Sequence, residues 1–361
     1  MNDRQALISL NLISQIGSVR LSVLLESFRT PGEIFQAKRK DLIAIIGEHL
    51  GSKIADFNRQ ELDEDLTLAQ KFGAKVITIA DPEYPQNLLQ IPGAPLVLYC
   101  WGEFCPEDNL SLGIVGSRQA SFYGLSSTEK FAVELVQKNL TIVSGLARGI
   151  DTCAHRGALK AGGRTLAVIG SGLSNIYPPE NENLAKAIAE SGAVISEFPM
   201  RALPLPNNFP RRNRLISGLS LGVLVTEAAR NSGALITADF ALEQGREVFA
   251  LPGRIDALQS WGTNALIKQG AKLVTCVEDI LEELNFSASF AVKKNQPEVT
   301  LDLQDNKKQT ALFDYIQKEA ISFDDLMQKT TWGAGKISQS ILKLQLQNLI
   351  KELPGKHFIR N

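Results

Sequence analysis

The feature that most constrains the fold is a series of short apolar segments, rich in valine and isoleucine, spread over residues 66–290. They are Val76–Ala80, Leu96–Cys100, Leu112–Val115, Thr141–Val143, Thr165–Ile169, Ala193–Ser196, Gly222–Val225, Glu247–Ala250 and Lys272–Cys276. Many are followed by glycine and then by helix-forming residues. Continuously apolar strands that alternate with helices are typical of a parallel sheet covered on both faces. This pattern predicts an extended Rossmann-like, doubly wound, mostly parallel α/β fold, with ligands at the carboxyl ends of its strands.

The flanking regions lack such segments and predict two further parts. Residues 1–65 show helical periodicity and short glycine turns, which predict a helical bundle of the sterile-alpha-motif or helix-hairpin-helix type. Residues 291–306 are polar and predict a linker. Residues 307–361 predict three helices and a Pro-Gly turn between apolar segments, which is the pattern of a winged helix. We therefore expect three domains, at 1–65, 66–290 and 307–361.

Charge is balanced over the whole chain but not along it. The 361 residues include 38 Lys plus Arg and 39 Asp plus Glu, for a net charge of −1, which excludes only a uniformly basic surface. Residues 200–214 hold four arginines and no acid, and residues 331–361 hold five basic residues and one acid. The winged helix therefore fits either nucleic acid or a protein partner. Residues 1–65, with eight basic and ten acidic residues, favour a structural bundle over DNA contact.

Cysteines and hydropathy indicate a cytoplasmic protein. The four cysteines form no CxxC pair and no metal-ligand pattern, so we expect reduced thiols, no metal site and no cofactor. The N-terminus lacks the apolar core of a signal peptide. No uncharged apolar segment reaches the roughly 18 residues of a membrane-spanning helix, so no membrane partner is expected.

Three predicted turns between a strand and a helix are suited to bind an anion. They are Gly113–Arg118, Ser144–Asp151 and Gly170–Gly172. Small residues let backbone N–H groups point at a phosphate, and an arginine adds a planar pair of donors. The candidate ligands are Ser117, Arg118, Gly145, Arg148, Gly149, Gly170 and Ser171. Neither GxxxxGK[ST] nor a complete GxGxxG occurs, which disfavours a P-loop hydrolase and a dinucleotide site.

The segment Met200–Arg214 combines arginines, prolines and one phenylalanine. Prolines at 204, 206 and 210 predict an extended loop up to Phe209. A ring beside guanidinium groups suits single-stranded nucleic acid, because bases stack on the ring. The alternative is that Phe209 packs in the core and the arginines cap helices or pair with acids. Candidates here are Phe209, Arg211, Arg212, Asn213 and Arg214. Asn231 and Ser232 follow another strand and are expected to cap a helix beside the same crevice.

Two pairs of residues raise the question of catalysis. Asp151 and His155 stand four residues apart on one predicted helix, but no nucleophile accompanies them, so we interpret them as a pair on the helix surface. Glu227 and Arg230 would carry the chemistry if the chain were instead a nucleotide-processing, phosphoribohydrolase-like enzyme. We expect the chain not to be an enzyme.

Several motifs together resemble the DNA-processing protein A family (DprA, also called Smf). They are Gly-Ser-Arg at 116–118, Ser-Gly-Leu-Ala-Arg-Gly-Ile-Asp at 144–151, His-Arg-Gly-Ala-Leu at 155–159, Phe-Pro-Arg-Arg-Asn-Arg at 209–214, Glu-Ala-Ala-Arg-Asn-Ser-Gly at 227–233 and Leu-Pro-Gly at 251–253. The resemblance covers the α/β region in order, and the flanking parts fit the family layout. It implies a single-stranded DNA groove without nucleotide hydrolysis, a homodimer, and loading of the RecA recombinase onto incoming DNA during natural transformation.

The resemblance also implies individual roles. Arg118 would be a main phosphate ligand and Phe209 the residue on which bases stack. Ser117, Arg148, Gly149, Arg211 and Arg214 would line the groove or hold its shape. Ile267 and Leu273 would be apolar contacts of the dimer, although both also suit a cover over the sheet. Asn207 and Asn208 stand where relatives often carry a basic residue or histidine, which predicts a modestly lower affinity.

Overall fold

The structure is a computed structural model that describes residues 1–284 and, beyond them, residues 313, 315–316, 321–330, 333, 337, 340–341, 344, 349–353 and 357–360. It divides into two compact units, Met1–Phe290 and Ala291–Asn361. The predicted linker at 291–306 lies outside the described residues. Over the described part of the chain, no helix is long and apolar enough to cross a membrane.

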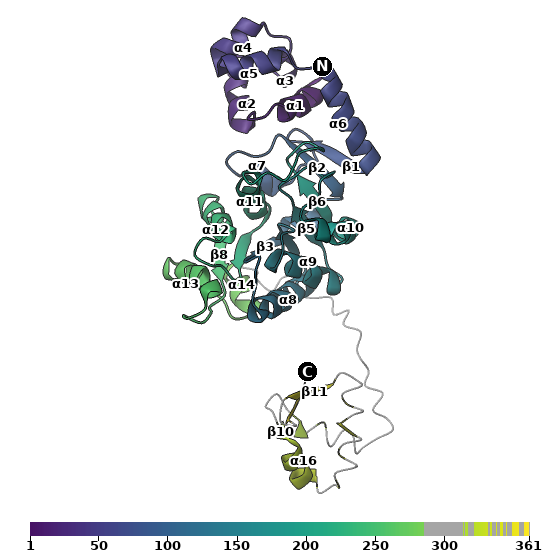
Figure 1. Ribbon diagram of the computed structural model, residues 1–361, viewed down its shortest axis with the longest axis vertical. Helices are drawn as coiled ribbons and strands as arrows, with labels where there is room; N and C mark the ends of the chain where they lie inside the picture. The colour runs from purple at the N-terminus through teal and green to yellow at the C-terminus, as the bar shows by residue number, and fades with distance from the viewer. Residues whose placement is uncertain are drawn as a thin grey trace. The chain divides into compact units, whose positions relative to one another are not determined.

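A nine-stranded sheet forms the centre of the first unit, with the order β1-β2-β6-β5-β4-β3-β7-β8-β9 (Figure 1). The strands are β1 (Ala74–Thr78), β2 (Val97–Gly102), β3 (Ser111–Val115), β4 (Thr141–Ser144), β5 (Thr165–Val168), β6 (Ala193–Ser196), β7 (Gly222–Val225), β8 (Glu247–Ala250) and β9 (Lys272–Leu273). Pairing is parallel from β6 to β9 and antiparallel in the pairs β1–β2 and β2–β6. Every predicted strand overlaps an observed one, which confirms the mostly parallel sheet.

Helices cover both faces of this sheet. They are α7 (Gln86–Leu89), α8 (Phe122–Gln137), α9 (Ile150–Lys160), α10 (Glu182–Ser191), α11 (Asn208–Leu219), α12 (Gly233–Glu243), α13 (Trp261–Lys268) and α14 (Val277–Glu283), with 3₁₀ turns η1 (Pro106–Asn109), η2 (Pro179–Asn181) and η3 (Leu258–Ser260). Apolar residues of α8, α9 and α14 share one core with β3, β4, β7 and β8. Those of α7, α11, α12 and α13 share another core with the sheet. The doubly wound prediction is therefore confirmed.

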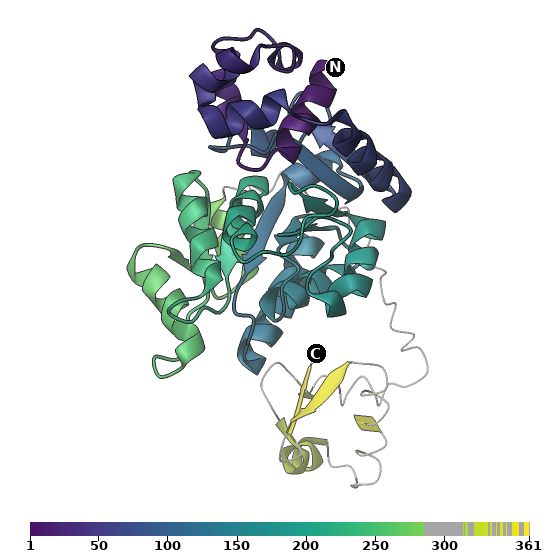
Figure 2. The ribbon, with the colours of Figure 1, turned by 45° about the horizontal axis from the view of Figure 1, so that its top comes forward.

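The N-terminal part is helical, as predicted, and packs on the β1–β2–β6 side of the sheet (Figure 2). Its helices are α1 (Asp3–Leu12), α2 (Ser18–Leu25), α3 (Pro31–Ile34), α4 (Arg39–Ile46), α5 (Glu48–Ala55) and α6 (Arg59–Phe72). Leu7 and Leu62 share one apolar core with Val194, and Tyr99 donates a 2.6 Å hydrogen bond to Asp65. Helix α6 runs through the expected boundary at residue 65 and leads into β1, so this bundle and the sheet form one unit.

The second unit contains the three-stranded sheet expected of a winged helix. Strands β10 (Ile321–Ser322), β11 (Ile350–Leu353) and β12 (His357–Arg360) pair antiparallel in the order β10-β12-β11. Helix α16 (Phe323–Thr330) contributes Leu326 to a core that also holds Ile337, Ile341 and Phe358. The predicted Pro-Gly turn, at 354–355, lies outside the described residues.

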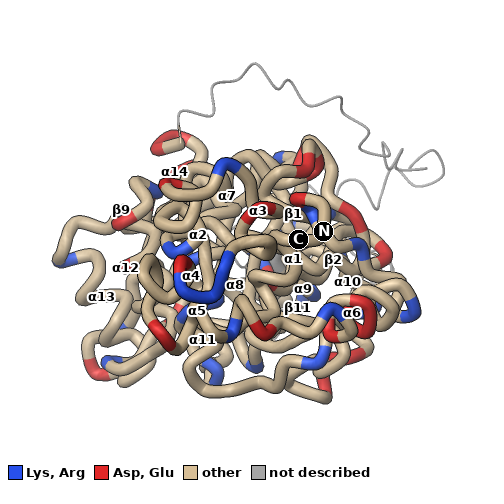
Figure 3. Tube along the Cα trace, turned by 90° about the horizontal axis from the view of Figure 1, so that it is seen from above, with Lys and Arg blue, Asp and Glu red and all other residues tan. Residues whose placement is uncertain are grey.

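Acidic and basic side chains are interspersed over the first unit. In Figure 3, the blue positions of Lys and Arg and the red positions of Asp and Glu are interspersed along the tube in that view.

Candidate nucleic-acid interface

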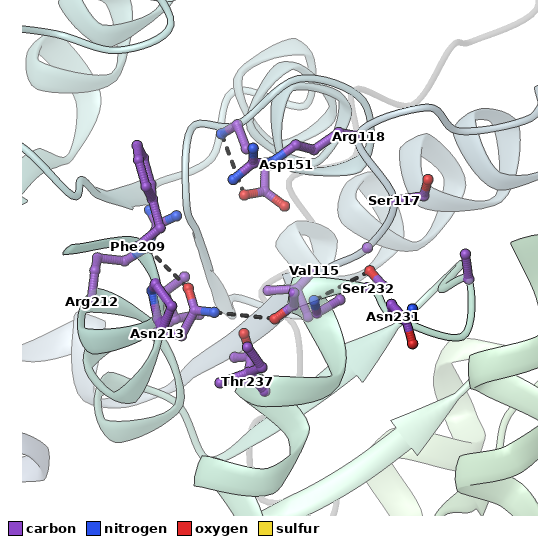
Figure 4. A pocket seen from close by; sticks show the side chains of 18 of the residues that line it. Val115, Ser117, Arg118, Asp151, Phe209, Arg212, Asn213, Asn231, Ser232 and Thr237 are labelled. Atoms are coloured by element: carbon purple, nitrogen blue, oxygen red, sulfur yellow. Dashed lines mark hydrogen bonds between the residues drawn. The ribbon is translucent and has the colours of Figure 1, made fainter. Parts of the chain in front are cut away.

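A cavity of about 810 Å³ opens beyond the carboxyl ends of the central strands. It is bordered by the turn after β3, the start of α11 and the β7–α12 loop (Figure 4). Strand β3 lies between β4 and β7, so the strand order runs outward from β3 in both directions. Open α/β sheets bind ligands at such a point, where the strand order reverses. Seven of the predicted site residues line this cavity: Ser117, Arg118, Phe209, Arg212, Asn213, Asn231 and Ser232.

Arg118 and Phe209 meet at the rim of the cavity. The guanidinium carbon of Arg118 lies 5.5 Å from the centroid of the Phe209 ring. Arg118 is exposed, and within the described residues no carboxylate forms an ion pair with it. The ring of Tyr177 stands 5.7 Å from that of Phe209, centroid to centroid. An exposed cation and two aromatic rings therefore lie together.

Phe209 rests on the third glycine turn. A Cβ atom added to Gly170 would lie 2.9 Å from Cδ1 of the ring, so only glycine allows this approach. Gly170 does not line the cavity itself, and Ser171 is buried, where its hydroxyl donates to the Asn175 carbonyl at 2.6 Å. These two residues support the site from beneath.

The prediction of an extended loop up to Phe209 is wrong at its end, because α11 begins at Asn208. Phe209 and Pro210 belong to the first helical turn, where proline is tolerated since N–H groups there have no intrahelical acceptor. The helix forms because Leu215 and Ile216 bury their side chains against the sheet. Phe209 is thus held by a helix and a turn together.

Arg212 is buried and connects two loops beneath the cavity through hydrogen bonds. Its side chain is 3% exposed, and its Nη1 donates to the carbonyls of Gly145 and Val168. Burial lowers its pKa to about 10, although the nearby Asp151 carboxylate acts in the opposite direction. A Cβ atom on Gly145 would lie 2.6 Å from both terminal nitrogens of Arg212. Arg212 therefore joins the ends of β4 and β5 under the cavity.

Asp151 and His155 are buried, so their interpretation as a surface pair is wrong. Asp151 accepts hydrogen bonds from the backbone N–H of Gly145 (3.1 Å) and Ala147 (3.3 Å), and burial raises its pKa. Nδ1 of His155 lies 2.7 Å from the Thr165 hydroxyl, and burial lowers its pKa to about 3. Both side chains fix α9 and the turn before it.

The other arginines of the predicted site pair with carboxylates. Arg211 and Arg214 both contact the buried Glu197, at 3.0 and 2.5 Å, and Arg214 is itself largely buried. Arg148 pairs with Glu180 on the surface. Neither Arg211 nor Arg214 lines the cavity.

The second glycine turn lies next to the Arg118–Phe209 contact. A small depression beside the main cavity is lined by Arg118, Gly145, Ala147, Arg148, Tyr177, Pro178 and Phe209. Gly149 has φ +73°, and a Cβ there would collide with the backbone carbonyls of Ser117 and Arg118. The first and second turns are therefore packed directly on one another.

The β7–α12 loop forms the wall of the cavity opposite Phe209. Ser232 caps α12, with its hydroxyl accepting from the Ala234 N–H at 3.3 Å, which confirms the predicted cap. Glu227 is buried, and both its oxygens accept from Ser121, the residue that caps α8. The carboxylate considered for catalysis thus fixes the start of a helix.

The predicted dimer residues lie at the far edge of the sheet. Ile267 on α13 is partly buried and packs on the sheet core. Leu273 stands on the edge strand β9 and is 44% exposed. A role for them between two chains stays a prediction.

Sequence reasoning missed several residues of the cavity, among them Gln119, Tyr177, Pro204, Pro206, Ile236 and Thr237. Tyr177 carried a usable signal, because it is an aromatic residue in the loop that follows the third glycine turn. Ile236 and Thr237 read as ordinary helix residues and gave no such signal.

Comparisons with known proteins identify the family of the chain. The family model described as DNA recombination-mediator protein A matches residues 75–285, and the DprA winged helix domain matches residues 296–356. Protein Smf of Escherichia coli K12 is 38% identical over 330 residues, 88% of each chain. DNA processing protein DprA of Streptococcus pneumoniae R6 is 45% identical over 217 residues, 60% of this chain and 76% of the relative.

Two solved structures are similar in fold. The X-ray structure of DprA from Streptococcus pneumoniae has a TM-score of 0.66 and 37% identity, and covers 78% of this chain and 98% of its own. A structure of DprA from Helicobacter pylori, described for its single-stranded DNA binding mode, has a TM-score of 0.54 and 29% identity, and covers 60% of this chain and 98% of its own. The chain therefore belongs to the DNA recombination-mediator protein A (DprA/Smf) family.

Proposed function

We propose that the chain binds single-stranded DNA in the 810 Å³ cavity, without catalysing a reaction. In the cytoplasm it would protect incoming strands and load the RecA recombinase onto them during natural transformation. It would act as a homodimer joined through the edge that carries Ile267 and Leu273. The single-stranded DNA binding described for the Helicobacter pylori relative supports the choice of ligand.

The observation that carries the proposal is the contact between Arg118 and Phe209. A guanidinium group binds phosphate oxygens through two parallel hydrogen bonds, and a phenyl ring stacks with any base. One repeating unit of a single strand presents both partners, a phosphate and an unstacked base. In duplex DNA the bases are already stacked on each other, so the ring would lack a partner.

The start of α11 adds to the attraction for phosphate. The first N–H groups of a helix lack intrahelical acceptors and form the positive end of its dipole. Asn207, the N-cap residue of α11, makes no side-chain hydrogen bond to them. Pro210 has no N–H and the Asn208 N–H already donates to the Leu205 carbonyl at 2.9 Å, so the contribution of this helix start rests on the helix dipole beside Phe209.

The proposal is tested by measuring oligonucleotide binding of three variants at fixed salt. Arg118→Ala and Phe209→Ala are each expected to weaken binding of a dT oligonucleotide by about 1–3 kcal/mol, roughly 5- to 150-fold. Arg201→Ala is the matched control, because Arg201 is an exposed arginine of the same cluster that does not line the cavity. Equal affinities of all three variants and the parent would contradict the proposal.

Loading of RecA is tested with single strands coated by a single-strand-binding protein. The parent is expected to shorten the lag before RecA hydrolyses ATP on that DNA, and Arg118→Ala is expected not to. An unchanged lag with the parent would leave DNA binding in place but remove the loading step. Release of free base from nucleoside monophosphates, abolished by Glu227→Gln, would instead indicate an enzyme.

A further inference from the structure

The contact between Arg118 and Phe209 has a counterpart elsewhere in the first unit. The guanidinium carbon of Arg230 lies 5.0 Å from the ring centroid of Trp261. Arg230 is exposed, and no carboxylate within the described residues pairs with it. Arg211 also lies over a ring, that of Phe198 at 5.2 Å, but Glu197 neutralises it.

Hydrogen bonds join the backbone on both sides of Trp261 to the wall of the cavity. The Ala228 N–H donates to the Gln259 carbonyl at 2.8 Å, and the Gly262 N–H donates to the Ala228 carbonyl at 2.6 Å. A Cβ on Gly262 would lie 2.7 Å from that carbonyl oxygen, so residues 259–262 press directly on the β7–α12 loop. The backbone on both sides of Trp261 is therefore fixed relative to this loop.

The same loop then forms part of the cavity lining. Ala229 and Asn231 both line the cavity, and Arg230 is the residue between them. Figure 4 shows Asn231 and Ser232 on the side of the cavity opposite Phe209. Arg230 and Trp261 do not line the cavity themselves, and they lie next to the loop that forms its wall opposite Phe209.

Exposure of the indole is large for a residue of this size. Trp261 is 48% exposed although it stands at the first position of α13, and Leu258 in the preceding turn is 79% exposed. Indole is the aromatic group with the largest face for a base, and an exposed cation over it is held less strongly than a stacked base. A nucleotide can therefore take the ring face while the guanidinium moves to its phosphate.

We propose that Arg230 and Trp261 form a second nucleotide-binding position on the same single strand. Trp261 stacks a base, Arg230 binds the adjoining phosphate, and the strand passes from Arg118 and Phe209 across Asn231. This inference rests on the proposed function and adds to it the direction in which the strand leaves the cavity.

The first test compares short and long oligonucleotides. Trp261→Ala is expected to bind a dT oligonucleotide of about 20 residues roughly 5- to 100-fold more weakly than the parent. Both proteins are expected to bind dT4 equally, because four nucleotides are about enough for the Phe209 position alone. Trp261→Phe is expected to keep most of the affinity, and Leu242→Ala, an equally apolar change at a 61% exposed site on α12, is expected to keep all of it.

The second test follows the indole directly. The chain has three tryptophans, at 101, 261 and 332, so Trp101→Phe with Trp332→Phe leaves Trp261 as the single emitter. Single-stranded dT20 is expected to quench its fluorescence, and a 20-residue abasic strand, which has phosphates but no bases, is expected not to. The same quenching by both strands would show that Trp261 only positions Arg230, and would overturn the stacking role.

The results separate this inference from the proposed function. If Phe209→Ala weakens binding of dT20 while Trp261→Ala does not, the second position is refuted and the first stands. If the parent itself does not bind dT20, the proposed function fails. The oligomeric state of Trp261→Ala is then measured by sedimentation. If a change in oligomeric state explains the whole loss of affinity, Trp261 belongs to an interface between chains and the inference is overturned.

Discussion

Gly170 supports the Phe209 ring, so we expect a substitution of Gly170 to weaken DNA binding even if Gly170 itself does not contact the DNA. In Gly170→Ala, the new Cβ would lie 2.9, 3.2 and 3.4 Å from ring carbons of Phe209. Carbon atoms in contact prefer about 3.5–4.0 Å, so the ring must move by roughly 0.6 Å or more. The backbone itself accepts alanine, because Gly170 is not among the residues with positive φ.

The displacement of the ring determines how much DNA affinity Gly170→Ala loses. Base–aromatic stacking contributes about 1–3 kcal/mol per base, and a shifted ring is expected to lose about half of it. We therefore expect Gly170→Ala to weaken binding of single-stranded DNA roughly 3- to 10-fold. Phe209 is only half-buried and can yield outward, so the free energy of unfolding should change by less than about 1 kcal/mol.

A double-mutant cycle measures whether the ring transmits this effect. Binding of a fluorescent dT oligonucleotide is followed by anisotropy for the parent, Gly170→Ala, Phe209→Ala and the double variant. Without the ring, Gly170→Ala should have no further effect. Effects that add within about 0.5 kcal/mol would refute the reasoning, because the two residues would then act independently. Gly17→Ala, where a Cβ meets nothing within 4 Å, is the matched control.

Three further predictions concern the structure around the cavity. In Gly149→Ala, the backbone φ of +73° is strained for alanine and the new Cβ collides with the backbone of the Arg118 turn. The free energy of unfolding in denaturant titrations should therefore fall by about 1–3 kcal/mol, and DNA binding should weaken although no charge is removed. Glu197→Gln should destabilise the protein by about 3–5 kcal/mol, since the largely buried Arg214 loses its counter-charge; a change below 1 kcal/mol would contradict this. For His155, the unfolded chain binds a proton below pH 6.5 and the folded chain only near pH 3, so between pH 6.5 and 5 this residue should cost about 2 kcal/mol of stability. His155→Phe should flatten that slope, and an equal slope in both proteins would disprove it.

The strands could be predicted from sequence because each is buried on both faces and therefore continuously apolar. Glycine turns after these strands located the cavity at the correct edge of the sheet, while anion binding there stays a prediction. Two of the turns need glycine for reasons that the sequence alone does not reveal: Gly145 lies against Arg212, and Gly170 against Phe209. Local pattern identified these positions, but only the packing of α11 explains them.

The roles of the arginines could not be separated by sequence. Arg211 and Arg214 pair with Glu197 only because α11 folds back over the end of β6. No sequence motif links these two segments, so the pairing could not be predicted. The extended loop was predicted to reach Phe209 because the prolines at 204, 206 and 210 outweighed the apolar residues that follow. Proline in the first turn of a helix leaves no intrahelical hydrogen bond broken, so this signal was ambiguous.

In the proposed complex, Arg118 and Phe209 hold one strand through a phosphate and a base. The most direct measurement is the affinity for single-stranded and duplex DNA of the same length across a salt series, for the parent and for Arg118→Ala. We expect tighter binding of the single strand and an affinity that falls as salt rises. The slope of log affinity against log salt should be smaller by about 0.7 in the variant, as one lost phosphate contact requires. Equal affinity for both DNA forms, with an unchanged slope in Arg118→Ala, would contradict the proposed complex.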